Sequence, residues 1–400
     1  MGDQAMRHDP EDVPRSAINR RQFLAAGAAP IGAALAGGMS DPRDLAKEDS
    51  SRRGGHTGER IRIGLIGAGE NVRTVMIPGF RRLPECELLA VANTSLESSQ
   101  RVAEEFGIPR AYPDWQELLS DDDVDAVCIG TWPYVHRTIT IDSLEAGKHV
   151  LCQARMANNA AEAHEMLDAS RRHTNLICQL VPTSTSYSID RVLQRLISEG
   201  YPGEILSVEV QRLQRDFAEL DGELDWRHDD TFSGLNSLNL GSTYESMMRW
   251  LGSGSRVIAM AQLHVPYRRT REGRLTSVAL PDHVDVLYEL ANGAQVHMRF
   301  SETTGLSTGN QTWIYGSEGT IQVDEKGDVF AGRRGDSALA PVPNPPSEQA
   351  SYRAEEEFIN AIRGIEPVTM ATFETGVHYM EWTEAVHRSA QTGQVVFLPL

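Results

Sequence analysis

The stretch Ile61–Gly69, which reads IRIGLIGAG, decides the fold of this chain. Its first six residues are mostly apolar and rich in isoleucine, which predicts a buried strand of a parallel sheet. A glycine turn follows at once, and then a helical stretch through Phe80 to Leu83. Gly67 allows the tight turn, Gly69 lets the backbone approach a pyrophosphate, and the helix N-terminus supplies N–H donors. Strand, turn and helix in this order are typical of a dinucleotide-binding fold.

The glycine pattern is incomplete, because the third glycine of a GxGxxG fingerprint would fall at Val72. That position normally allows close packing of strand and helix, so the phosphate contact itself is kept. Glu70 and Asn71 follow the second glycine, and we expect both beside the cofactor.

The end of the second predicted strand, 87–92, bears on the choice of cofactor. Asn93 and Thr94 stand where an acidic residue would bind the ribose 2′-hydroxyl of NAD. An uncharged strand end does not repel a 2′-phosphate, so the sequence slightly favours NADP over NAD. No arginine stands at position 94 to bind that phosphate, and both cofactors stay open.

Predicted helices and strands alternate through the rest of this half. Repeated βα units predict a parallel, doubly wound sheet, and we assign 61–182 to a Rossmann-type domain that binds a nicotinamide dinucleotide. The expected helices are 96–106, 114–120, 137–146 and 160–173, and the expected strands are 124–130, 149–152 and 176–180.

The composition excludes several classes of protein. With 400 residues, 40% of them hydrophobic, the chain is globular and long enough for two domains. A formal net charge of −18 disfavours nucleic acid or an anionic membrane surface as a partner. The four cysteines have neither a CxxC nor a zinc-ligand spacing, so we expect buried thiols, no disulfide and no structural metal. No apolar run is long enough to span a membrane.

The first sixty residues have the features of a signal peptide followed by a linker. Arg20 and Arg21 precede Phe-Leu and a weakly apolar stretch, 25–36, which ends in the small-x-small pattern Ala-Leu-Ala. This order predicts a twin-arginine signal peptide over 1–36, followed by a linker over 37–60. We therefore expect a periplasmic or otherwise exported protein that folds around its cofactor before export.

Several motifs together resemble the Gfo/Idh/MocA family, which includes glucose–fructose oxidoreductase and inositol dehydrogenase. They are TWPYVH at 131–136, like the family's TxPxxH; AGKHVLC at 146–152, like its AGKHVLCEKP; WLG at 250–252; EFINAI at 357–362; and VFLP at 396–399. The resemblance covers 61–400. It implies an NAD(P)-dependent oxidoreductase in which Thr131, Pro133, His136 and Gln153 contact the cofactor.

The resemblance also implies an α+β second domain, 183–400, with an open, mostly antiparallel sheet. The outer face of that sheet would form a homodimer or homotetramer. Alternating apolar residues support this, and Asn292-Gly293 is a hairpin turn signal. We expect a loop at 338–346 and two helical stretches within 352–392 that return to cover the sheet. The expected strands are 204–212, 257–265, 283–290, 295–301, 311–316 and 319–323.

The chain departs from the family at the catalytic residues. The family's EKP is Gln153-Ala154-Arg155 here, and the alanine can neither bind nor deprotonate a hydroxyl as the family's lysine does. The family's DxGxH is Asn239 to Thr243 here, so its aspartate and its histidine are both absent. Threonine has no pKa suited to acid–base work near neutral pH. The absence of the family's lysine, aspartate and histidine indicates a distinct subgroup of the family that the chain resembles.

Four residues are candidate replacements for the missing acid–base groups. His136 should lie near the nicotinamide, although a structural histidine is an equal alternative. His228 lies in a loop that, by resemblance, lines the substrate pocket. Tyr244 and Glu245 adjoin the lost histidine, but helical periodicity places Tyr244 in the core rather than at the site.

Four further residues are candidate substrate contacts: Arg155, Arg227, Asn239 and Thr243. Arg227 suits a carboxylate or a sugar hydroxyl, and a surface charge cluster is its alternative role.

Three functions follow from these observations. The first is an exported oxidoreductase that acts on a sugar, sugar acid or cyclitol with a tightly bound NAD(P). The second is a redox-neutral enzyme that cleaves a glycoside with bound NAD. The third is a dinucleotide-binding protein without catalysis, which the three losses favour and the intact glycine turn opposes.

Overall fold

The computed structural model describes residues 60–183 and 186–400. The predicted signal peptide, and the linker up to residue 59, lie outside the described residues. Within the described ranges, no helix combines the length and the apolar character that crossing a membrane requires.

The first domain is built on a six-stranded sheet with the order β3-β2-β1-β4-β5-β6. All its strand pairs are parallel. The order reverses between β1 and β4, which is where ligands bind in doubly wound sheets. The predicted fold class of this half is confirmed. The strands are β1 (Ile61–Ile66), β2 (Cys86–Ala92), β3 (Arg110–Tyr112), β4 (Ala126–Ile129), β5 (His149–Cys152) and β6 (Cys178–Leu180).

Helices cover this sheet, and one begins earlier than the sequence predicts. Helix α6 starts at Pro133 rather than at residue 137, because proline lacks an N–H and suits the first helical turn. The helices are the π-helical turn η1 (Val72–Met76), which continues into α3 (Ile77–Arg81), then α4 (Leu96–Phe106), α5 (Trp115–Leu119), α6 (Pro133–Glu145) and α7 (Ala160–Arg172).

The second domain contains a nine-stranded sheet with the order β16-β15-β14-β13-β7-β12-β11-β8-β17. Only the β7–β12 pair is parallel within this sheet, so the predicted open, mostly antiparallel sheet is confirmed. Its strands are β7 (Ile205–Leu213), β8 (Gly254–Gln262), β11 (His283–Leu290), β12 (Gln295–Ser301), β13 (Gln311–Gly316), β14 (Gly319–Val323), β15 (Val329–Arg333), β16 (Ala340–Pro341) and β17 (Val396–Phe397); a separate ribbon pairs β9 (Tyr267–Arg269) with β10 (Leu275–Ser277).

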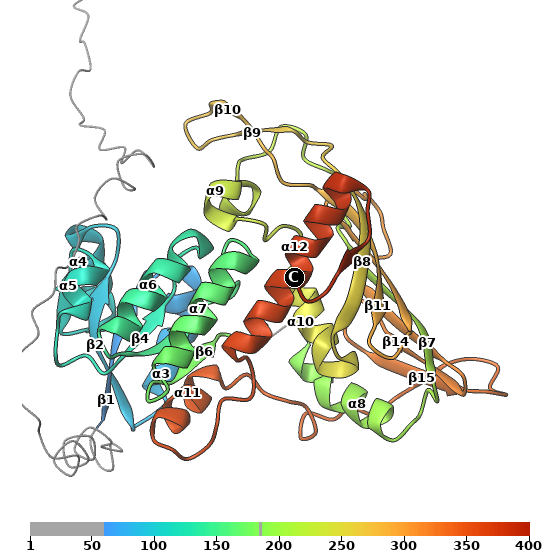
Figure 1. Ribbon diagram of the computed structural model, residues 1–400, viewed down its shortest axis with the longest axis horizontal. Coiled ribbons are helices and arrows are strands. Elements are labelled where there is room, and N and C mark those ends of the chain that lie inside the picture. The colour runs from blue at the N-terminus through green and yellow to red at the C-terminus, as the bar shows by residue number, and fades with distance from the viewer. Residues whose placement is uncertain (1–59, 184–185) are drawn as a thin grey trace, which may run out of the picture. The chain divides into compact units, whose positions relative to one another are not determined.

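The helices of this half do not all cover the second sheet. In Figure 1, α12 lies between α7 of the first domain and the second sheet, and it contacts α10 as well. The other returning helix, α11, packs on α3, and its Phe358 and Ile359 complete the core around Ile61 and Met76. The sequence predicts both over the second sheet, yet only α12 lies there. The helices are α8 (Tyr187–Ser198), the short turn η2 (Trp226–His228), α9 (Asp230–Ser233), α10 (Leu240–Leu251), α11 (Ala354–Ile362) and α12 (Phe373–Thr392).

Tyr244 joins α10 to α12 in the core. Its ring stacks on Trp382 with a centroid distance of 4.5 Å and an interplanar angle of 6°. Its hydroxyl oxygen accepts a hydrogen bond from the Gly254 N–H at 2.8 Å, and the residue is buried. The structure therefore places this candidate catalytic residue in a packing role, which the helical periodicity also favours.

We predict that Tyr244→Phe lowers the free energy of unfolding by about 1–2 kcal/mol, because the Gly254 N–H loses its buried acceptor. Tyr288 supplies a matched control, since its hydroxyl is buried and has no partner among the described residues. Tyr288→Phe should be neutral or stabilising. Urea unfolding of both variants measures the difference, and equal losses would contradict this assignment.

Candidate functional site

A cleft of about 440 Å³ lies at the carboxyl edge of the first sheet, where the strand order reverses. Backbone from the turn after β1, from the end of β2 and from the end of β4 surrounds it, and its position is the one that nucleotides occupy in such sheets. The lining residues from these three segments are Gly67, Ala68, Gly69, Asn93, Thr94, Gly130 and Thr131.

Two glycines of this cleft, Gly67 and Gly130, are required by close contacts, whereas a Cβ on Gly69 would meet only the Gly130 carbonyl oxygen, at 3.9 Å. Gly67 has a φ of +81°, and a Cβ there would lie 2.5 Å from Thr131 Cγ2. A Cβ on Gly130 would lie 2.1 Å from Val72 Cγ2. Val72 stands at the missing third glycine position and is buried. The close approach of strand and helix is therefore retained, with the glycine supplied by β4 instead of by the helix.

Asn93 fixes the shape of the glycine turn. Its side-chain oxygen accepts the Ala68 N–H at 2.7 Å, and its Nδ2 donates to the Ser98 carbonyl at 3.2 Å. The residue lines the cleft as the sequence predicts, but its amide already has local partners.

Helix α4 contributes cleft residues that sequence reasoning missed. Ser98, Arg101 and Glu105 line the cleft from one face of this helix, and Arg73 lies opposite them in an ion pair with Glu105. These residues are spaced by three and four positions, which places them on one face of a helix, and this pattern could have identified them from the sequence. Arg101 pairs with Glu97 at 3.5 Å on the surface.

The other predicted cofactor contacts lie beside the cleft. Gln153 Nε2 donates to Asn71 Oδ1 at 2.8 Å and so ties the end of β5 to the glycine turn. The side chain of Asn71 makes no capping bond at the start of η1. The Arg73 N–H is bonded to the Gly69 carbonyl, so the backbone N–H groups left for a phosphate are those before Arg73, in the first helical turn. Glu70 is exposed next to them.

These residues fit a dinucleotide. The turn presents backbone N–H groups without a side chain in the way, and the hydroxyl oxygen of Thr131 is buried with no partner among the described residues. A buried hydroxyl of this kind is satisfied by a polar group of a bound molecule.

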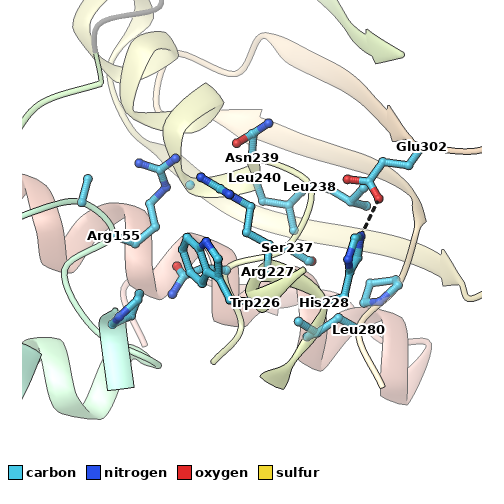
Figure 2. Close-up of a pocket in the computed structure, with 15 residues that line it drawn as sticks. Arg155, Trp226, Arg227, His228, Ser237, Leu238, Asn239, Leu240, Leu280 and Glu302 are labelled. Carbon is cyan, nitrogen blue, oxygen red and sulfur yellow. Dashed lines mark hydrogen bonds and ion pairs between the residues drawn. The ribbon is translucent and has the colours of Figure 1, made fainter. Parts of the chain in front are cut away.

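A second cavity, of about 130 Å³, lies between the two domains. Figure 2 shows its polar side chains converging from the end of β5, from η2, from the start of α10 and from the segment after β12. Its lining includes Pro133, Ala154, Arg155, Trp226, Arg227, His228, Asn239, Gly241, Leu280 and Glu302.

His136 lines neither cavity. It is fully buried, and its Nδ1 and Nε2 each lie 2.9 Å from a carbonyl oxygen, that of Arg155 and that of Thr131. Burial lowers the pKa of this imidazole, against the opposing effect of the two carbonyls. The structure gives it the structural role that the sequence leaves open: it packs between the segments that border the two cavities, and as a neutral imidazole it donates its one N–H to one of the two carbonyl oxygens.

His228 and Glu302 form an acid–base pair inside the second cavity. His228 Nε2 lies 3.2 Å from Glu302 Oε2 (Figure 2), and both residues line the cavity. His228 Nδ1 is buried without a partner in the described part of the chain. Sequence reasoning missed Glu302, because it follows β12, an interior strand of the second sheet, and belongs to no motif.

Three of the four predicted substrate contacts meet in this cavity. Arg155, Arg227 and Asn239 line it, and Asn239 begins α10 with a φ of 58°. Thr243 lies one turn further along α10 and faces a different cavity of about 210 Å³, beside Arg212 and Ser246.

Glu245 is also held away from the second cavity. It is buried, and its Oε1 accepts from the Thr183 N–H at 3.0 Å and from Arg249 at 2.9 Å. Burial raises the pKa of its carboxyl, and the neighbouring arginines oppose that rise. The structure thus brings His228 to the cavity, and not His136, Tyr244 or Glu245.

Two family models match the chain. Residues 61–180 match an oxidoreductase family with an NAD-binding Rossmann fold, and residues 191–322 match the GFO/IDH/MocA C-terminal domain. Together these matches cover both domains and more than half of the chain.

Characterised relatives are dehydrogenases. Levoglucosan dehydrogenase of Pseudarthrobacter phenanthrenivorans is 28% identical over 291 residues, which is 66% of this chain and 73% of that protein. Trans-1,2-dihydrobenzene-1,2-diol dehydrogenase of Sus scrofa is 26% identical over 301 residues, 73% of this chain and 83% of that protein.

Solved structures share the fold. Levoglucosan dehydrogenase in complex with NADH and L-sorbose matches with a TM-score of 0.73 at 23% identity, covering 85% of this chain and 99% of that one. Aldose–aldose oxidoreductase from Caulobacter crescentus matches with a TM-score of 0.67 at 19% identity, covering 85% and 100%.

We predict that His136 makes stability depend on pH below neutrality. Its folded pKa lies below its unfolded value of about 6.5, so its contribution is present above that pH and is lost as the pH falls toward the folded pKa. Between the two pKa values the slope is about 1.4 kcal/mol per pH unit. Unfolding of wild type and His136→Asn between pH 8 and pH 5, measured by urea titration, should show a shallower slope for the variant. Identical slopes would contradict a neutral, buried His136.

Proposed function

The chain belongs to the Gfo/Idh/MocA family of NAD-binding oxidoreductases, and on that premise we propose that it oxidises or reduces a hydroxyl of a sugar, sugar acid or cyclitol. One observation carries the proposal: the segment 131–134 separates the dinucleotide cleft from the polar cavity. Thr131 and Trp132 line the cleft, and Pro133 lines the cavity. A dinucleotide in the cleft would thus present one end to a substrate in the cavity.

An aromatic pair supports this arrangement of cofactor and substrate. Trp132, which lines the cleft, stacks on Trp226, which lines the cavity, with centroids 6.0 Å apart and planes at 16°. Aromatic faces suit the apolar faces of sugars, and the Trp132 side chain is 43% exposed, so it is accessible to a bound molecule.

The residues of the cavity supply the acid–base part of the reaction. The bound dinucleotide supplies or accepts the hydride. His228 and Glu302 share the proton that leaves the reacting hydroxyl during oxidation and return it during reduction, through the hydrogen bond between Nε2 and Oε2. Arg155, Arg227 and Asn239 orient the remaining polar groups of the substrate.

We also propose that the cleft accepts NADP as well as NAD, with a slight preference for NADP. Asn93 brings no carboxylate to the ribose, and Arg101 lines the cleft with its guanidinium exposed, 3.5 Å from Glu97. Arg73 adds a second cation there, although Glu105 neutralises part of its charge. Solved structures of levoglucosan dehydrogenase contain NADH, which supports the proposal that the cleft also accepts NAD.

Export and self-association complete the proposal. The paired arginines at positions 20 and 21 support transport by the twin-arginine route. Exposed apolar side chains on the outer face of the second sheet, including Met260 and Leu287, support a homodimer or homotetramer. The N-terminus of the exported protein and its mass in solution test these two points.

We predict that the purified chain carries a nicotinamide dinucleotide, identified by mass after denaturation, and turns over a carbohydrate alcohol. Glu302→Gln and His228→Gln should each lower kcat by about 100-fold, the usual effect of losing a positioned acid–base group. Glu318→Gln is the control, since that carboxylate is exposed in the turn between β13 and β14 and does not line the polar cavity.

Three outcomes decide between this function and its alternatives. Turnover without net cofactor reduction would favour the redox-neutral enzyme. A chain that binds a dinucleotide but turns over nothing would favour a non-catalytic role. A chain that binds neither NAD nor NADP would contradict both oxidoreductase proposals.

We predict that Arg101→Met raises the Kd for NADPH by about 10-fold and leaves the Kd for NADH unchanged, because only NADPH offers a 2′-phosphate to the guanidinium. Arg171→Met is the matched control, on the exposed face of α7. Nicotinamide fluorescence titrations measure both constants. Equal effects on the two cofactors would show that Arg101 does not read the phosphate.

A further inference from the structure

The second cavity contains a guanidinium group that the protein itself does not neutralise. Arg155 lines the cavity, and no hydrogen bond or ion pair joins its side chain to another residue in the described ranges. The residue is half-buried, and desolvation of its guanidinium lowers its pKa. A desolvated charge without a counter-ion costs free energy that a bound anion would offset.

A second guanidinium faces the same space. Figure 2 shows Arg155 and Arg227 turned toward one part of the cavity, and each charge opposes the other. Arg227 lies over the Trp226 ring at 4.5 Å, and its ion pair with Asp225, at 3.5 Å, is exposed on both sides. An exposed pair of this kind neutralises little of the charge that the cavity experiences.

The start of α10 adds further positive potential. This helix has 12 residues, and the side chain of its N-cap residue Asn239 makes no capping bond. Leu240 and Gly241, in its first turn, line the cavity. A Cβ on Gly241 would lie 3.3 Å from Arg155 Cδ, so the arginine side chain passes directly along the helix start. The Leu240 N–H is bonded to the Ser237 carbonyl at 3.0 Å, which leaves the Gly241 N–H as the amide of this turn that faces the cavity without a partner among the described residues. A free amide at a helix start beside a guanidinium forms an anion-binding arrangement.

Carboxylates of the protein do not balance these groups. Among the residues that line the cavity, Glu302 is the only acid, and it pairs with His228. Glu245 influences Arg155 from a distance but is bound to Arg249 and to the Thr183 N–H. The lining thus carries two guanidinium groups against one carboxylate.

We propose that this cavity binds the carboxylate of a sugar acid, held by Arg155, by Arg227 and by the Gly241 N–H at the start of α10. Resting on the proposed function, this makes the substrate an aldonate or uronate rather than a neutral sugar. A guanidinium matches the two oxygens of a carboxylate with two parallel N–H groups. A phosphate dianion fits less well, because Glu302 would repel its second charge.

The test uses glycerate and glycerol, which differ only by the carboxylate, with the full mature chain. We expect glycerate, but not glycerol, to raise Tm, and isothermal titration to give a Kd that Arg155→Met increases by about 10- to 100-fold. Arg227→Met, a change at an exposed side chain, should weaken binding less. Arg155→Lys keeps the charge but lacks the planar pair of N–H groups, so its Kd for glycerate should lie between those of the wild type and Arg155→Met. With two variants at this position, a folding defect in one of them does not decide the result.

Controls separate this site from other anion effects. Arg271→Met removes an arginine that is almost fully exposed, on the loop between β9 and β10, and should leave glycerate binding unchanged. Inorganic phosphate should bind more weakly than glycerate. The proposal is overturned if phosphate binds more tightly, or if glycerate and glycerol act alike on the wild type.

Turnover distinguishes failure of this inference from failure of the proposed function. Gluconate and glucuronate are compared with glucose, and Arg155→Met should lower kcat/KM for the acids by a larger factor than for glucose. Turnover of neutral sugars alone, unchanged in Arg155→Met, would overturn the inference and keep the oxidoreductase. Glycerate binding that depends on Arg155, in a chain that turns over no sugar of either kind, would keep the anion site and remove the oxidoreductase.

Discussion

The two cavities depend on one buried side chain, His136. Its imidazole lies between the carbonyl oxygens of Thr131 and Arg155, 2.9 Å from each. The first of these segments borders the dinucleotide cleft, and the second positions the guanidinium in the polar cavity. Because His136 is the fourth residue of α6, the helix that Pro133 begins, the cofactor site and the substrate site share one rigid support.

The fold was predictable where the information is local. The glycine turn, the alternation of strands and helices, and the β-rich second half each depend on residues a few positions apart, and the structure confirms them. Contacts between distant segments were not predictable. The packing of Val72 on Gly130 and the position of α11 on the first domain involve partners that no periodicity in the sequence brings together.

Residues of the candidate site were likewise predictable where a sequence motif marks them, and not where only a contact in space does. Arg155, Arg227, His228 and Asn239 belong to motifs or adjoin them, and the structure brings all four to one cavity. Glu302 belongs to no motif, and its role becomes visible only through its contact with His228. Thr243 shows the opposite error: its position in a motif suggested a substrate contact, but a helix turn carries its side chain to another cavity.

Three of the changes from the family motifs meet in one cavity. Ala154, Arg155 and Asn239 all line the polar cavity, whereas Gly67 and Gly130 of the dinucleotide cleft keep their close contacts. Random loss of function would affect both cavities alike, because neither would any longer be needed. Retention of one and chemical change of the other instead fit a protein that still binds its cofactor and has altered what it holds beside it. Replacing a lysine by alanine and an aspartate by asparagine, with an arginine added, changes the distribution of charge in the cavity, which is the change that an anionic substrate requires.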